Sequence, residues 1–76
     1  MKKEEFLVAL EDILQTEDAI LGSQNLEELE EWDSLSKMAV MAYFKKAFSI
    51  EINLNNLKEV KFVEDLIKLA GDKIDA

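Results

Sequence analysis

The residues best placed to support chemistry are Asp33 and Ser34, which stand at the start of an apolar stretch with helical periodicity. The chain of 76 residues has no Cys and no His, and so no thiol nucleophile, imidazole base or soft metal ligand. Asp is a favoured helix N-cap, which would place Ser34 in a first turn whose free N–H groups and dipole favour an anion. A phosphate ester on Ser34 would suit that field. We therefore predict that Ser34 carries an attached group that supplies the missing chemistry.

The carboxylates that precede this serine form the other candidate site. Their spacing does not follow the alternating ligands of a calcium loop, so we expect a solvated acidic patch and no metal site at Glu27, Glu28, Glu30 and Glu31. A paired-carboxylate hydrolase would also need a substrate cleft, which so short a chain has little material to build. We therefore predict no catalytic site of paired carboxylates.

Composition narrows the class of partner. Seventeen acidic and nine basic residues give a formal net charge of −8. Such a field repels nucleic acid and anionic lipid and steers the chain toward basic protein surfaces, although the charge could instead serve only solubility. The N-terminus lacks the apolar run of a signal peptide, and no apolar stretch approaches the roughly 20 residues of a membrane span. We expect a soluble, cytoplasmic monomer, with the absence of Cys fitting a reducing compartment.

Apolar periodicity and turn residues predict an all-α fold. Helices are expected at about 3–15, at 34–48 with Asp33 as cap, at 54–59 with Asn53 as cap, and at 62–70 with Gly71 as the stop. Ile50 and Ile52 alternate with polar residues, a weak strand signal. The long first loop, 16–32, should be anchored on the core by Ile20, Leu21, Leu26 and Leu29. We predict one domain, 1–76, built as a small four-helix bundle with three main helices and one short helix.

The second helix has two apolar faces. One gathers residues expected in the core, namely Val40, Met41, Phe44, Ala47 and Phe48, and the other gathers Leu35, Met38, Ala39 and Ala42. If only the first face meets the core, Leu35 and Met38 form an exposed strip for partners beside Ser34. The alternative is a central helix that is buried all round. Trp32 is either a loop anchor over the core or an exposed contact, and Tyr43 is expected to be half-buried.

These residues resemble the acyl carrier protein family. Asp33-Ser34-Leu35 heads an apolar helix at mid-chain in an acidic sequence, and the likeness runs from the first helix to the last. The form Glu31-Trp32-Asp33-Ser34-Leu35-Ser36 is similar to that of discrete carriers outside the housekeeping fatty-acid set. The family commonly has Gly at the position of Glu31, and acidic residues at those of Ala39, Lys45 and Lys46. These departures favour a specialised pathway over general fatty-acid synthesis.

The resemblance implies that the protein is a carrier and not itself an enzyme, with no catalytic residue. Ser34 would receive 4′-phosphopantetheine from coenzyme A through a phosphopantetheinyl transferase, and the thiol of that arm would carry acyl intermediates as thioesters. Asp33 would cap the helix and assist the transferase, while Leu35 and Met38, with Trp32 and Glu31 beside them, would contact partners. Those partners would include a loading ligase and downstream transferases or synthases. Two alternatives stay open: an aminoacyl or peptidyl carrier, and an acidic helical interaction module with an unmodified Ser34.

Overall fold

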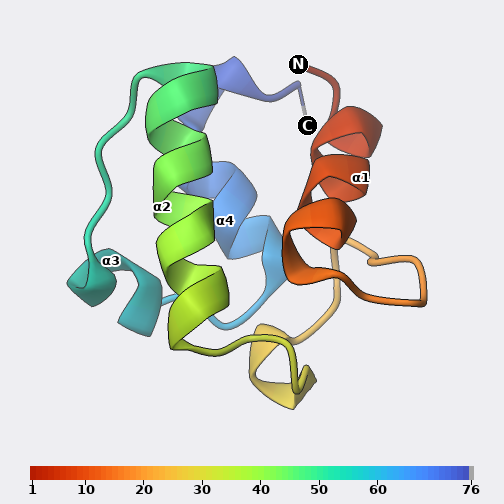
Figure 1. Cartoon of the computed structure of the whole chain (residues 1–76). Coiled ribbons are helices and arrows are strands. Elements are labelled where there is room, and N and C mark those ends of the chain that lie inside the picture. Colours follow the sequence, from red (N-terminus) through yellow and green to blue (C-terminus); the bar gives the residue numbers. More distant parts are fainter. Residues whose placement is uncertain (76) are drawn as a thin grey trace.

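The computed structural model describes residues 1–75 and contains four α-helices with two short 3₁₀ turns (Figure 1). The helices are α1 (Lys3–Leu14), α2 (Ser34–Phe48), α3 (Leu54–Lys58) and α4 (Val63–Leu69). The 3₁₀ turns are η1 (Leu26–Glu28) and η2 (Gly71–Lys73). The predicted all-α bundle of three main helices and one short helix is confirmed. No β-strand is present in residues 1–75, so the alternation of Ile50 and Ile52 produces only a half-buried connection.

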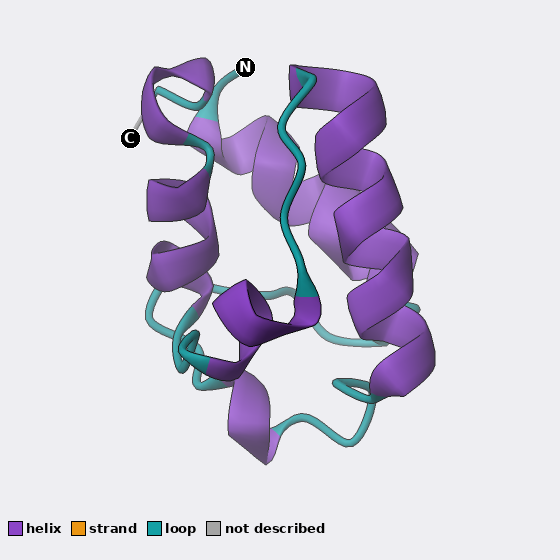
Figure 2. Cartoon of the chain, turned by 90° about the vertical axis from the view of Figure 1, so that its left-hand side faces the viewer, coloured by secondary structure: helices purple, strands orange, loops and turns teal. Residues whose placement is uncertain are grey.

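The two longest helices run side by side in opposite directions, with α4 behind them and α3 near the lower end of the bundle (Figure 1). The view turned by 90° shows the connection from α2 descending to α3 (Figure 2). Both chain ends meet at the opposite end of the bundle, where the Lys3 N–H donates to the Asp75 carbonyl at 3.1 Å. The start of α2, with Ser34, therefore lies at the end of the molecule away from the termini.

Apolar side chains from all four helices meet in one core. Phe6 of α1 packs edge-on against Phe44 of α2 with ring centroids 6.0 Å apart, and Phe44 packs edge-on against Phe48 at 5.2 Å. Leu57 of α3 and Leu66 of α4 complete this core and are almost fully buried. The Phe6–Phe44 contact therefore packs α1 against the second half of α2.

The first loop is anchored largely as predicted. Ile20 and Leu26 are buried, and Leu29 is half-buried against the core. Leu21, in contrast, is 63% exposed, so its predicted anchoring role is wrong. Its carbonyl accepts from the Gln24 N–H at 3.0 Å in a turn, and the turn leaves the Leu21 side chain in solvent.

Backbone hydrogen bonds tie the same loop to the start of α4. The Leu26 N–H donates to the Lys61 carbonyl at 2.7 Å, and the Val63 N–H donates to the Gln24 carbonyl at 3.0 Å. The loop is therefore a fixed part of the fold, which determines the direction from which the chain enters α2.

Only one of the observed helix ends is at a glycine that the sequence marked as a stop. Gly71 adopts φ 63° after the last residues of α4, which confirms the predicted stop. The chain then makes the turn η2 and buries Ile74, which the pattern did not predict. α1 and α2 end at Gln15 and Ser49, which take the left-handed conformation at φ 55° and 58° although neither is Gly. None of the helices in residues 1–75 combines the length and apolarity needed to cross a membrane.

Candidate functional site

Asp33 caps α2 as predicted. Its Oδ1 accepts the Ser36 N–H at 2.9 Å, and the Asp33 N–H donates to Ser36 Oγ at 2.9 Å. This is a reciprocal capping box, in which two backbone donors at the helix start are satisfied by side chains. The direction of the chain into α2 is thereby locked one residue before Ser34.

The capping bond also sets the charge state of Asp33. The Ser36 backbone N–H, donating to the carboxylate, holds the pKa of Asp33 below its usual value. A hydrogen bond to the ionised form favours that form. The cap is therefore negatively charged near neutral pH, beside the positive end of the α2 dipole.

Ser34 is the first residue of α2, and its side chain is exposed. Within residues 1–75, the cap is made by Asp33 and Ser36, and the Ser34 hydroxyl enters no side-chain hydrogen bond. Replacing or esterifying that hydroxyl would leave the capping box intact. Ser34 thus combines access to solvent with a fixed backbone.

Ser36 is the residue that the sequence reasoning missed. It is 8% exposed and is the reciprocal partner of Asp33, and its hydroxyl also donates to the Asp33 carbonyl at 3.0 Å. The signal was present in the spacing, since a hydroxyl three residues after an N-cap Asp can close such a box. The two serines of the motif therefore have different roles, one structural and one accessible.

The apolar strip on α2 is exposed, as expected if only one face of the helix meets the core. Leu35 is 79% exposed and Met38 is 58% exposed, and Ala39 and Ala42 beside them also face solvent. Val40, Phe44 and Phe48 on the other face are buried, whereas Ala47, expected with them, is exposed. The alternative of a helix buried all round is wrong.

Trp32 lies between loop and core. Its side chain is half-buried and packs against the core, which agrees with the loop-anchor interpretation. The Lys37 ammonium lies 5.6 Å from the centre of the indole ring, a cation–π contact. This contact holds the positive charge of Lys37 near the first turns of α2. Lys37 and Ser34 lie on the same side of the helix, because they are three residues apart.

A groove of about 380 Å³ runs between the end of α1 and the start of α2. Asp33 and Leu35, the two neighbours of Ser34, line it together with Ser36 and Ala39. Glu31 and the α1 end, Ile13, Leu14 and Gln15, complete the walls. The structure therefore brings Glu31, Asp33, Leu35 and Ser36 of the motif to one groove, while Ser34 itself, Trp32 and Met38 lie outside its lining.

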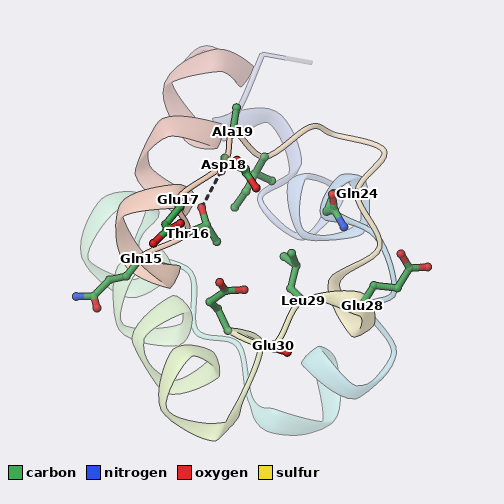
Figure 3. A pocket seen from close by; sticks show the side chains of 11 residues that line it. Gln15, Thr16, Glu17, Asp18, Ala19, Gln24, Glu28, Leu29 and Glu30 are labelled. Carbon is green, nitrogen blue, oxygen red and sulfur yellow. Dashed lines mark hydrogen bonds between the residues drawn. The ribbon is translucent and has the colours of Figure 1, made fainter.

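A second hollow, of about 520 Å³, lies between the start and the end of the first loop (Figure 3). Figure 3 shows Leu29 and Glu30 pointing into it from below, with Thr16 hydrogen-bonded to the Asp18 carbonyl opposite. Glu27, Glu28 and Glu30 are exposed and Glu31 is half-buried. Across the part of the chain that is described, no three carboxylates or other ligands are grouped so as to hold a metal ion.

Comparison of the chain with protein-family models, with curated proteins and with solved structures found no match.

Proposed function

We propose that this protein is an acyl carrier of the phosphopantetheine-dependent type, with Ser34 as the attachment residue. The observation that carries the proposal is the position of Ser34: exposed, first in a 15-residue helix, and held by a capping box in which it takes no part. The resemblance of Asp33-Ser34-Leu35 to the carrier motif supplies the identity of the attached group. The protein itself would be no enzyme, and its place would be the cytoplasm.

Attachment is a transfer onto the Ser34 hydroxyl. The hydroxyl oxygen would form a bond to the phosphorus of coenzyme A that bears pantetheine. The pyrophosphate linkage would break, 3′,5′-ADP would leave, and the hydroxyl proton would pass to a base of the transferase. The arm then supplies a thiol that holds an acyl group as a thioester, which the Cys-free chain cannot provide.

The residues around Ser34 fit a phosphodiester. The first turn of α2 presents its positive end, and Lys37 lies one turn further along on the same side. Asp33 is negatively charged like the phosphodiester, but its carboxylate accepts the Ser36 N–H and is therefore already engaged in the cap. A single negative charge on Ser34 is therefore compatible with its surroundings.

The exposed strip fits the partners that such a carrier needs. A carrier must dock in turn on a transferase, a loading ligase and the enzymes that use its cargo. Leu35 and Met38 place an adaptable apolar surface within one turn of the attachment point. Within α2 the charged residues are all lysines, which differs from the acidic helix of general fatty-acid carriers. We therefore propose a specialised pathway, and an aminoacyl or peptidyl cargo remains an alternative within the same mechanism.

Intact mass spectrometry tests the attachment. The purified chain, incubated with coenzyme A, Mg²⁺ and a broad-specificity phosphopantetheinyl transferase, should gain the mass of one phosphopantetheine. The Ser34→Ala variant should gain none and should fold normally, because Ser34 makes no side-chain contact in the cap. Ser23→Ala, a change in the first loop, is the matched control and should be modified fully.

An unchanged mass for the wild-type chain under conditions that modify a known carrier would overturn the proposal. That result would favour the other candidate, an acidic helical module that docks through Leu35 and Met38 without any modification.

A further inference from the structure

We infer that the enzymes that dock on α2 present carboxylates to its C-terminal half, although the net charge of the chain favours basic surfaces. This inference rests on the proposed function, because it concerns the partners of a carrier. Two features of the exposed side of α2 support it. The first is the apolar strip near Ser34, formed by Leu35 and Met38, and the second is a pair of lysines further along, Lys45 and Lys46.

Helical spacing places the two lysines in line with the apolar strip. Lys45 follows Met38 by seven residues, close to two turns, and Lys46 follows Ala42 by four, and all of these residues are exposed. At about 1.5 Å per residue, the backbone of Lys46 lies about 12 Å along the helix from Met38 and about 16 Å from Leu35. The exposed side of α2 is therefore apolar in its first half and positively charged in its last turn.

The lysines of α2 differ in how far their charge is compensated. The Lys45 ammonium is paired with the Glu51 carboxylate, and both side chains are more than half exposed. Within residues 1–75, Lys46 forms no ion pair. Lys37, the remaining lysine of α2, is held over the Trp32 ring in the first turns. Lys46 is therefore the cation that a partner must accommodate at the far end of the strip.

An interface centred on the strip extends to Lys46. A specific interface covers roughly 800 Å² on each partner, a patch about 30 Å across, and so reaches about 15 Å from its centre. If the centre lies between Leu35 and Met38, the patch includes the Lys46 side chain. An ammonium covered by an apolar or positively charged surface loses its hydration without compensation. A partner that fits the whole patch must therefore supply a carboxylate there, at the end of α2 away from Ser34.

The net charge of the whole chain makes the opposite prediction. At −8, the summed field favours a basic partner. Salt limits the range of that field, however, to a Debye length of about 8 Å at physiological ionic strength. Contacts at the end of α2 then depend mainly on the charges nearest to them, Lys45 and Lys46. A preference for acidic over basic contacts at this site distinguishes the local charges from the overall one.

Two synthetic helical peptides serve as partner probes. Both have a stripe of leucines in one half, and the other half has glutamates in one peptide and lysines at the same positions in its counterpart. Holo protein labelled with ¹⁵N, its arm verified by intact mass, is titrated with each peptide by nuclear magnetic resonance at about 50 mM NaCl. We expect the glutamate peptide to bind about fivefold more tightly than the lysine peptide. Its binding should shift the amide signals of Leu35, Met38 and Lys46.

Three variants at exposed positions separate charge from apolar contact. Lys46→Glu should reverse the preference, so that the lysine peptide binds more tightly. Lys68→Glu makes the same change of net charge on α4, behind α2 in Figure 1, and should keep the preference of the wild type. Leu35→Ala should weaken the binding of both peptides by a similar factor, because the leucine stripe is common to them. Circular dichroism should show unchanged helix content in all three.

A glutamate peptide that does not bind, that binds no more tightly than the lysine peptide, or that leaves Lys46 unshifted would overturn the inference while leaving the attachment at Ser34 intact. Equal effects of Lys46→Glu and Lys68→Glu would overturn it too, because net charge would then decide the preference. A protein that gains no arm would be recognised at the mass measurement, and both proposals would then be wrong.

Discussion

At the scale of single residues, the Asp33–Ser36 pair explains why Ser34 can be both ordered and accessible. The two neighbours satisfy the backbone at the helix start, so the residue between them is left free to face solvent. An attachment site on a mobile loop would lack this fixed orientation. The capping box is therefore the local feature on which the candidate site depends.

The charge of Asp33 predicts a dependence of stability on acid. Its folded-state pKa lies below the unfolded value, so its contribution is fully present above about pH 4 and is lost as the pH falls through the folded pKa. Asn is also a good cap but does not titrate in this range. The difference in melting temperature between wild type and Asp33→Asn should therefore be constant from pH 5 to pH 7. Below about pH 4 the melting temperature of the wild type should fall relative to that of Asp33→Asn.

Thermal unfolding by circular dichroism at a series of pH values measures that difference. Glu4→Gln, at an exposed position in α1, serves as the control for the loss of one negative charge. A difference between wild type and Asp33→Asn that stays constant down to pH 2 would contradict the role assigned to the ionised cap.

At the scale of the elements, the first loop behaves as a structural element. Leu26 is 0% exposed within the turn η1, and its N–H is bonded to the segment that precedes α4. The same loop contains Leu21, which is 63% exposed. One loop thus holds a core leucine and a surface leucine five residues apart, and they provide a direct test of anchoring.

Leu26→Ala should destabilise the protein by about 2–5 kcal/mol, the range for a leucine in a hydrophobic core, because it leaves a cavity in a fully packed site. Leu21→Ala should change the free energy of unfolding by less than about 0.5 kcal/mol. Urea denaturation of both variants checks this. A small effect of Leu26→Ala would mean that the loop is only loosely attached.

The end of α4 allows a second test at this scale. Gly71 has φ 63°, and a Cβ added there would meet no atom within 4 Å. Gly71→Ala should therefore cost roughly 1 kcal/mol from backbone conformation alone. Gly71→Asn should cost less, because Asn tolerates the left-handed region better. Equal stability of all three proteins in urea denaturation would show that the helix end is not held in this conformation.

At the scale of the whole molecule, repulsion among carboxylates reduces the stability that a small hydrophobic core provides. The net charge is −8, and residues 1–75 form only two ion pairs, Lys3 with Glu64 and Lys45 with Glu51. Both pairs are at least partly exposed and therefore contribute little to the free energy of unfolding, so salt can remove only a small stabilisation. Screening should therefore relieve more repulsion than attraction.

The melting temperature should accordingly rise when NaCl is increased from about 10 mM to 150 mM, where the Debye length falls from roughly 30 Å to 8 Å. A variant with Glu27, Glu28 and Glu30 changed to Gln should show a smaller rise. A melting temperature that is flat or falls with ionic strength would contradict this account.

The features determined by the sequence alone are those that depend on neighbours along the chain. The start of α2 after Asp33, the start of α3 after Asn53 and the stop at Gly71 follow from capping and turn chemistry within a few residues. The division of α2 into a buried and an exposed face follows from helical periodicity. The identity of the attached group follows only from the resemblance and stays a prediction.

Tertiary structure decided what depends on segments that are distant in the sequence. Leu21 and Leu26 are identical residues in one loop, and only the bonds from the loop to the start of α4 determine which of them is buried. The convergence of Gln15 and Glu31 on one groove with Asp33 likewise requires the end of α1 to pack against the start of α2. Periodicity and capping contain no information on such approaches, because they arise from the free energy of packing the whole core.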